Sequence, residues 1–230
     1  MRTIGLIGGM SFESTSIYYR IINESVRDRL GAFHSAEILL HSVDFQNIVD
    51  MQKSDRWSDA GQRLADGATR LEQAGADCVL ICTNTMHLIS DTVEQAIDVP
   101  LIHVIDETAK VLLQAGRKKP LLLGTRYTME QGFYAKRMEV HGIELLIPDE
   151  ADRTTVHDII FNELCTGLVL ASSRSQLIAI IDKATLSGAD AVIFGCTELG
   201  LILNTDELPV TGFDSTAIHC AAAVDFSLAD

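Results

Sequence analysis

Gly75-Ala-Asp-Cys-Val-Leu-Ile-Cys-Thr83-Asn-Thr is nearly repeated later in the chain as Gly188-Ala-Asp-Ala-Val-Ile-Phe-Gly-Cys196-Thr-Glu. Each copy has a glycine of the kind that ends helices, then a short apolar run, then a group of polar residues. Thr83 and Cys196 lie at equivalent positions, eight residues after the glycine. The repeat therefore predicts two similar half-molecules that present similar loops.

Two further pairs of segments repeat in the same order. Leu6-Ile-Gly-Gly9 matches Leu122-Leu-Gly-Thr125, and Asp106-Glu-Thr-Ala109 matches Asp214-Ser-Thr-Ala217. Measured from Gly8 to Gly124, from Gly75 to Gly188 and from Asp106 to Asp214, the offsets are 116, 113 and 108 residues. The two halves therefore keep one order of motifs and differ slightly in length.

Apolar runs of strand length alternate with longer segments of helical period, the pattern of a parallel sheet covered by helices. We expect strands near residues 3–7, 36–41, 77–82, 100–104, 120–124, 143–147, 190–194 and 209–213. We expect helices from a capping Ser11 to Gly31, from about 57 to Gly75 and from about 172 to Gly188. The predicted fold is α/β, with two pseudo-symmetric αβα domains and mostly parallel sheets.

The repeat also predicts where the domains divide. Because the Asp214 segment mirrors the Asp106 segment, we expect the chain to return to the first domain near its end. The first domain is predicted to contain residues 1–98 and 208–230, and the second residues 99–207. Ligands collect at the carboxyl ends of parallel strands. The polar loops at 8–11, 83–87, 125–128 and 196–198 all follow strands, so we expect one active site in a cleft between the domains.

Composition narrows the class of partner. The 230 residues are 47% hydrophobic, as in an ordinary globular protein, and carry a formal charge of −14. This charge argues against nucleic acid and anionic membranes as partners. No apolar run approaches the length of a membrane helix, and we interpret residues 4–10 as a first strand and not a signal peptide. Five cysteines without regular spacing indicate free thiols in a reducing compartment, by default the cytoplasm.

Cys196 is the first candidate for chemistry, because it directly follows an apolar strand and precedes Thr197 and Glu198. A thiol at a helix start can have its pKa lowered from about 8.5 toward neutrality, which would make it a usable base or nucleophile. A free cysteine is also commonly a small buried hydrophobic residue. The internal copy favours the functional interpretation.

Thr83 occupies the equivalent position in the first copy. A threonine hydroxyl is too weak an acid to lose its proton at neutral pH, so it relays a proton only with help from a neighbour or a water molecule. Cys82 lies one position earlier, and in a strand this step turns its side chain to the opposite face. We therefore expect Cys82 to pack in the core.

The residues around these two positions are suited to holding an anion. Asn84, Thr85, Thr197 and Glu198 supply amide, hydroxyl and backbone groups in mirrored loops, as a carboxylate and a developing enediolate need, although the same residue types cap helices. The Gly8–Ser11 turn opens a helix but lacks the spacing of a nucleotide-binding motif, so we expect a carboxylate there.

Other polar residues give weaker signals. Gln52, Arg126 and Tyr127 lie where they could reach the cleft, and His87 could orient a proton relay, although a structural role is the simpler interpretation. Glu163 is expected on a solvated helix face. The histidines lack metal-ligand spacing, so no metal site is predicted.

Four motifs together resemble the aspartate/glutamate racemase family over essentially the whole chain, and within it the broad-specificity enterobacterial branch. They are Gly8-Gly9-Met10-Ser11, Cys82-Thr-Asn-Thr-Met-His87, Leu123-Gly-Thr-Arg-Tyr-Thr-Met129 and Gly195-Cys-Thr-Glu198. The resemblance implies racemisation of a small acidic amino acid between two domains by two thiols, with no cofactor. It also implies a homodimer.

Carried onto this chain, the second thiol of the family falls on Cys196 and the first on Thr83. The resemblance places substrate contacts at Met10, Gln52, Thr83 to Thr85, Thr197 and Glu198. It implies that Cys196 starts from L-aspartate or L-glutamate and that Thr83 serves the opposite face. Reaction from a D-amino acid would need Thr83 as base and should be slow.

Two alternatives remain at this point. A superfamily relative that keeps only the second thiol, such as a decarboxylase of malonate-type acids or a maleate isomerase, needs one proton-active cysteine. A binding protein for an acidic metabolite, with catalysis lost, needs none.

Overall fold

The computed structural model describes residues 1–229 and divides the chain into two compact units. One unit contains Met1–His103 together with the chain from His219 onward, and the other contains Val104–Ile218. The second crossing lies inside helix α10 (Ser215–Leu228). The predicted boundaries near residues 98 and 208 lie before these points. Whether either unit folds as a separate domain stays a prediction.

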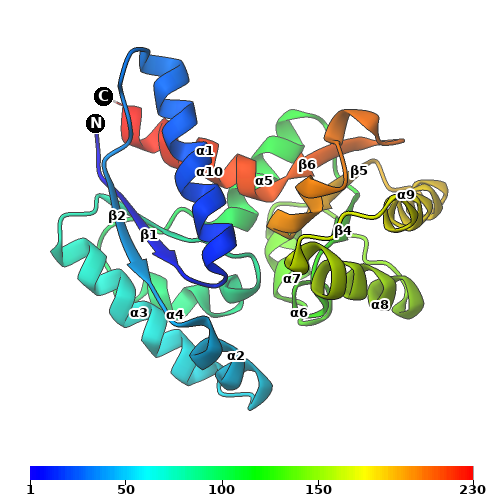
Figure 1. Cartoon of the computed structure of the whole chain (residues 1–230), viewed down its shortest axis with the longest axis horizontal. Helices are drawn as coiled ribbons and strands as arrows, with labels where there is room; N and C mark the ends of the chain where they lie inside the picture. Colours follow the sequence, from blue (N-terminus) through cyan, green and yellow to red (C-terminus); the bar gives the residue numbers. More distant parts are fainter. Residues whose placement is uncertain (230) are drawn as a thin grey trace. The chain divides into compact units, whose positions relative to one another are not determined.

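The first unit is a parallel sheet with helices on both faces (Figure 1). Its strands are β1 (Ile4–Gly8), β2 (Ile38–Ser42) and β3 (Cys78–Ile81), in the order β2-β1-β3. Alternate residues of β1 and β3 face opposite sides. Ile7 and Val79 pack against α3 (Trp57–Gln73), whereas Leu6 and Leu80 pack against α1 (Phe12–Leu30) and α10. The remaining elements are α2 (Phe45–Lys53), α4 (Ser90–Glu94) and the 3-10 turn η1 (Thr85–Ile89).

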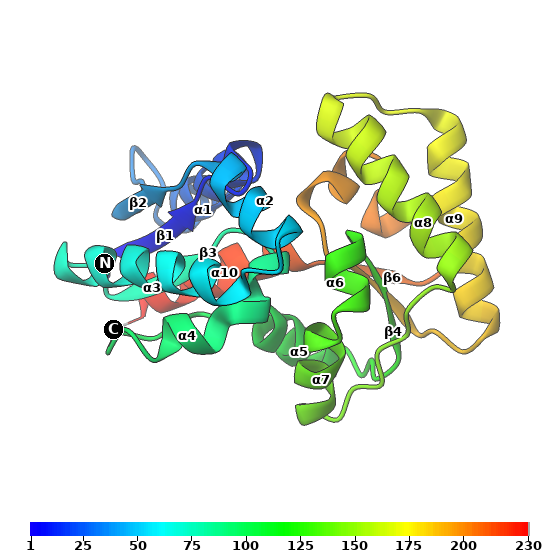
Figure 2. The same ribbon diagram turned by 90° about the horizontal axis from the view of Figure 1, so that it is seen from below.

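The second unit repeats this plan. Its strands are β4 (Pro120–Leu123), β5 (Ala191–Phe194) and β6 (Thr211–Asp214), all parallel and in the order β4-β5-β6. Leu123 and Val192 face α8 (Glu150–Asp158) and α9 (Ala171–Leu186), while Leu122 and Ile193 face α5 (Val104–Gln114) and α7 (Phe133–Val140). Figure 2 shows α8 and α9 side by side. The remaining elements are α6 (Arg126–Glu130), the π-helical turn η2 (Ile159–Glu163) and the 3-10 turns η3 (Leu164–Thr166), η4 (Thr197–Leu201) and η5 (Thr205–Glu207).

The two sheets have the same strand order once two short contacts are included. Val79 forms a parallel bridge to Leu101 beside β3, and Leu121 forms one to Leu146 beside β4. Each unit therefore has four adjacent chain segments in equivalent order, of which three are strands. The predicted α/β class with parallel sheets is confirmed. The predicted strands at 100–104 and 143–147 are each reduced to a single bridge.

The predicted helix limits agree with the structure to within about one residue. Ser11 caps α1 by accepting a hydrogen bond from the Ser14 N–H at 3.3 Å, and α1 ends at Leu30 before Gly31. The helices α3 and α9 end shortly before Gly75 and Gly188, which have φ angles of +100° and +96°. Both glycines adopt the left-handed conformation that other residues rarely take.

Of the helices described within residues 1–229, none is long and apolar enough to cross a membrane.

Candidate active site

The loop after β1 is held by its own helix. The Gly9 N–H donates to the Thr15 hydroxyl at 2.8 Å, and that hydroxyl donates to the Ser11 carbonyl at 2.9 Å. Gly9 has a φ of +89°, and a Cβ there would lie 2.2 Å from the Val43 carbonyl oxygen. Only glycine therefore fits where this backbone passes the end of β2.

The loop after β3 presents Thr83 at the end of a buried strand. Cys82 is fully buried among the residues that pack against α1, as expected, and burial strongly raises the pKa of its thiol. The next residue, Thr83, is partly exposed, Asn84 is buried, and Thr85 opens η1. The Thr83 N–H donates to the Ile81 carbonyl at 2.8 Å, and its carbonyl bonds to the His87 Nδ1 at 2.9 Å.

Two predicted substrate contacts lie near this loop with different surroundings. Met10 is 4% exposed and packs in the core with Met86, so contact with a substrate there falls to its backbone. Gln52, on the last turn of α2, is half-buried, and its amide contacts the Met86 sulfur at 3.2 Å. The structure thus connects Gln52 to the η1 turn that follows Thr83.

The loop after β5 presents the equivalent cysteine beside a carboxylate. The Cys196 thiol donates to the Glu198 Oε2 at 2.9 Å, and the Thr197 hydroxyl donates to the same oxygen at 2.7 Å. Gly195, just before, packs tightly, because a Cβ there would lie 2.8 Å from the Leu122 side chain. Cys196 and Thr197 therefore both bond to one oxygen of Glu198, and the three residues form one cluster.

The surroundings of the thiol favour its protonated form. Burial and the Glu198 carboxylate raise the pKa of Cys196 well above its ordinary value. The backbone N–H of Glu198 lowers it, but this effect is smaller. The expected lowering of the thiol pKa by a helix start is therefore wrong. The turn that follows is a short 3-10 helix, and the nearest charge is negative.

The loop after β4 points to structural roles. Thr125 caps α6 by accepting from the Thr128 N–H, as its residue type allows. The Arg126 guanidinium donates to the Thr154 hydroxyl at 3.3 Å, which ties α6 to α8. Glu163, expected on a solvated face, accepts a hydrogen bond from Ser173 at 2.5 Å. Arg126 and Glu163 therefore both connect elements within the second unit.

The structure brings the predicted site residues together within each unit. Thr83, Asn84 and Thr85 form one loop of the first unit, and Cys196, Thr197 and Glu198 form one loop of the second. The pairing of Thr83 with Cys196 stays a prediction. Among the described residues there is no group of three His, Cys, Asp or Glu side chains arranged to hold a metal ion.

Sequence reasoning missed several residues that support these loops. The Ser14 hydroxyl donates to the Cys82 carbonyl at 3.3 Å, and the Ser215 hydroxyl donates to the Phe194 carbonyl at 2.7 Å. Small hydroxyl residues in the first turn of a helix were the available signal. Cys165 was also missed: loss of hydration and the Glu198 carboxylate raise its pKa to about 11.

One hollow on the second unit does not include Cys196 in its lining. It is lined by residues of the segment after η4, including Asn204, together with Arg174, Glu207 and Asp214. Arg174 and Glu207 form an ion pair at 2.8 Å within this lining. Cys196, Thr197 and Glu198 do not line it.

Comparisons with known proteins agree on one family. A family model described as Asp/Glu/Hydantoin racemase matches residues 7–223. The crystal structure of a Yersinia pestis protein, provisionally named an Asp/Glu racemase, is 48% identical over 100% of both chains, with a TM-score of 0.95. An aspartate racemase homologue from Pyrococcus horikoshii OT3 is 33% identical over 99% of both chains, with a TM-score of 0.89. The broad specificity amino-acid racemase RacX of Bacillus subtilis (strain 168) is 24% identical over 98% of both chains.

Proposed function

The chain belongs to the Asp/Glu/Hydantoin racemase family and is an isomerase of the racemase type, and from this premise we propose that it racemises acidic amino acids without a cofactor. The resemblance inferred from the four motifs is thereby confirmed. The proposed substrates are L-aspartate and L-glutamate, and the proposed reaction moves the α-proton from one face of the α-carbon to the other.

Cys196 is proposed as the base that acts on the L-enantiomer. Its thiol already donates to Glu198 at 2.9 Å, so Glu198 can take the sulfur proton as the thiolate forms. The thiolate then removes the α-hydrogen, and the electron pair of the broken C–H bond passes into the substrate carboxylate as an enediolate. The contact between Cys196 and Glu198 is the observation that carries the proposal.

Thr83 is proposed to serve the opposite face of the α-carbon. Its hydroxyl passes a proton to the α-carbon and takes one from a water molecule, and the proton held by Glu198 then returns to the solvent and neutralises the hydroxide that is left. Backbone and amide donors of Asn84 and Thr85 are proposed to hold the substrate carboxylate, with Met10, Gln52 and Thr197 as further contacts. The net charge of −14 repels such a substrate, so hydrogen-bond donors at the site must outweigh this electrostatic repulsion.

The proposal extends to the assembly and location of the protein. The family resemblance supports a homodimer. Five free cysteines support a reducing compartment such as the cytoplasm.

The proposal is tested by incubating the protein in heavy water with each L- and D-amino acid and following loss of the α-hydrogen signal by NMR. We expect exchange with L-aspartate or L-glutamate, and its loss in Cys196→Ser with the fold retained. Normal turnover by Cys196→Ser would contradict the assignment.

The same experiment separates the alternatives. A single cysteine with no thiol at the equivalent position is what a one-faced decarboxylase needs, so release of CO₂ from a malonate-type acid without any amino-acid exchange would favour that function. Binding of L-glutamate without exchange, unchanged in Thr83→Cys, would favour a binding protein.

A further inference from the structure

Three buried histidines lie close together, and one of them contacts the Thr83 loop. His87, His103 and His219 are 3%, 4% and 0% exposed. The ring centroids of His87 and His103 are 4.5 Å apart, and those of His87 and His219 are 5.7 Å apart. The proposed function uses none of these residues, yet burying three imidazoles together is costly unless their polar atoms are bonded.

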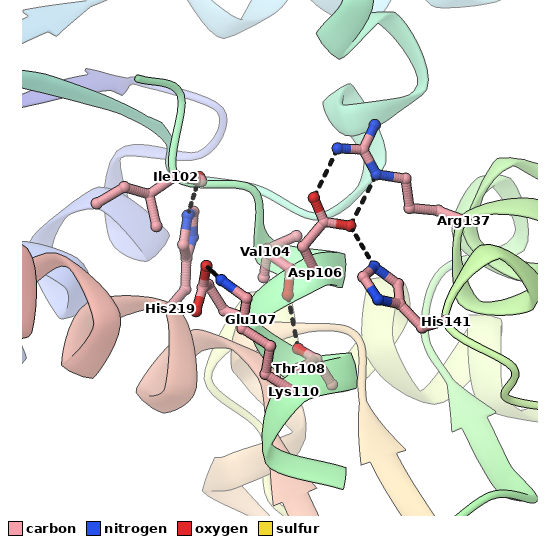
Figure 3. Close-up of polar contacts among 9 residues, drawn as sticks. All are labelled: Ile102, Val104, Asp106, Glu107, Thr108, Lys110, Arg137, His141 and His219. Carbon is pink, nitrogen blue, oxygen red and sulfur yellow. Dashed lines mark hydrogen bonds and ion pairs between the residues drawn. The ribbon is translucent and has the colours of Figure 1, made fainter. Parts of the chain in front are cut away.

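Hydrogen bonding fixes the protonation of His219. Its Nε2 lies 2.6 Å from the Ile102 carbonyl oxygen, which can only accept, so Nε2 carries the proton (Figure 3). In the neutral ring Nδ1 is then an acceptor, and the Tyr18 hydroxyl donates to it at 2.9 Å. His219 is thus a neutral ring that anchors α10 to the segment before α5.

The same argument fixes His87 as a donor. Its Nδ1 lies 2.9 Å from the Thr83 carbonyl oxygen, so Nδ1 carries a proton that is donated to the backbone of residue 83. The Thr83 N–H donates to the Ile81 carbonyl at 2.8 Å. Both backbone groups of Thr83 are therefore held, one by the preceding strand and one by an imidazole packed among two others.

We call the hydrogen bond from His87 to the Thr83 carbonyl the clamp, and the second unit has no equivalent of it. The offset of 113 residues that relates Thr83 to Cys196 relates His87 to Gly200. The Cys196 carbonyl instead accepts from the Leu199 N–H at 3.2 Å within η4. The imidazole is therefore present only in the half whose reactive group is a hydroxyl. Since a hydroxyl offers little acid strength, its proton transfer depends on placement more than a thiol's does.

We propose that His87 is a positioning residue for Thr83: its Nδ1–H holds the backbone of residue 83 so that the hydroxyl meets the substrate face opposite Cys196. This rests on the proposed function. The clamp acts on one direction of proton transfer only. Loss of the donor should slow protonation at the Thr83 face and leave exchange at the Cys196 face in place.

The test compares two rates in one sample. L-aspartate or L-glutamate is incubated in heavy water, and deuterium in the L-isomer, returned by Cys196, is measured against formation of the D-isomer by chiral chromatography. In His87→Leu the ratio of D-formation to L-exchange should fall at least about tenfold, because small misplacements of a reacting group have effects of that size or more. In His87→Asn, whose amide N–H can replace Nδ1–H, the ratio should stay near that of the wild type.

His103→Leu is the matched control, because it removes another buried ring of the cluster whose Nε2 bonds to the Ser90 hydroxyl at 3.2 Å. It should lower stability and leave the ratio unchanged. An unchanged ratio in a folded His87→Leu, or an equal fall in His103→Leu, would overturn the inference while leaving the proposed function intact. Absence of any exchange in the wild type would overturn both.

A second measurement does not depend on a variant that folds. Long-range proton–nitrogen NMR of the wild-type protein reports which ring nitrogen of each histidine carries the proton. We expect Nδ1–H for His87 and Nε2–H for His219. A neutral His87 protonated on Nε2 would show that the clamp does not exist.

Discussion

At the residue scale, the Cys196 thiol lies in surroundings that disfavour its charged form. Cys196 is half-buried, and the carboxylate nearest to its thiol repels a thiolate. The Cys196 thiolate therefore forms only when a neighbouring group accepts the proton of the thiol. Glu198 therefore has two effects under the proposed function: it keeps the resting thiol neutral and offers the acceptor for its proton.

Replacing Glu198 by Gln should make the thiol more reactive and the enzyme less active. The charge that raises the pKa of Cys196 is removed, so a larger fraction of the thiol ionises at a given pH. A lower pKa raises the fraction of thiolate but lowers the nucleophilicity of that thiolate. The two effects together should raise alkylation by iodoacetamide by about threefold per unit of pKa decrease. The measurement is the alkylation rate of the Cys196 peptide at pH 8, followed by mass spectrometry so that Cys165 is counted separately.

Thr197→Val provides the control for this experiment. It removes the hydroxyl that donates to Glu198 at 2.7 Å and keeps the carboxylate. Alkylation of Cys196 should then stay the same or slow down. A rate in Glu198→Gln that is no higher than in the wild type would show that the carboxylate does not control this thiol.

The positions of Thr83 and Cys196 at the ends of strands could be predicted from the sequence, but the state of Cys196 could not. The repeat shows where each strand ends, so it places Thr83 and Cys196 on loops. The direction of the Glu198 side chain depends on a 3-10 turn and on packing around it, neither of which the pattern reveals. Reasoning from helix starts counted the backbone N–H and missed the larger opposing effect of the carboxylate.

At the element scale, prolines explain why two predicted strands are reduced to single bridges. At the Leu101 bridge, the Val79 N–H donates to the Pro100 carbonyl and the Ile102 N–H donates to the Val79 carbonyl. The helix α5 then begins at Val104. The bridge at Leu146 lies just before Pro148, which has no N–H to extend a ladder. Apolar composition predicted strands at both segments, and each forms only one bridge because its length is limited by where the chain must turn.

The helix α10 carries a buried histidine that should make stability depend on pH. Burial and the neighbouring His87 lower the pKa of His219 from 6.5 to about 3. The unfolded chain binds the proton more readily, so the stabilisation by neutral His219 is complete above pH 6.5 and is lost as the pH falls toward 3. Between pH 7 and pH 5 this residue alone should reduce the free energy of unfolding by about 2 kcal/mol.

The expected change is measured by urea unfolding of the wild type and of His219→Gln at both pH values. Glutamine keeps an N–H for the Ile102 carbonyl and does not titrate. The free energy of unfolding of the variant should therefore fall by about 2 kcal/mol less than that of the wild type between pH 7 and pH 5. An equal loss in both proteins would show that His219 does not titrate on unfolding.

At the scale of the whole molecule, the repeat predicts the fold better than it predicts the roles of matched residues. Both units have the same strand order, as the matched motifs indicated. However, Asp106 accepts hydrogen bonds from Arg137 on α7 and from His141 just after it (Figure 3), whereas Asp214 accepts from N–H groups at the start of α10. The matched pattern preserves backbone paths, whereas the hydrogen-bond partners of a matched side chain differ between the two copies.

The same reasoning applies to the two reactive loops. Their equivalent positions bear a hydroxyl and a thiol, and only the first has a histidine behind it. A duplicated fold with unequal reactive groups should treat the two enantiomers unequally in rate, although the equilibrium between them is fixed by the substrate alone. This asymmetry is the central claim for the molecule.

The most direct test is the initial rate of α-hydrogen exchange in heavy water, measured separately from the L- and D-enantiomers of the preferred acidic amino acid, in the wild type and in Thr83→Cys. We expect the wild type to exchange the L-enantiomer readily and the D-enantiomer slowly, and Thr83→Cys to gain exchange of the D-enantiomer. Equal initial rates for both enantiomers in the wild type, or no gain in Thr83→Cys, would contradict the account.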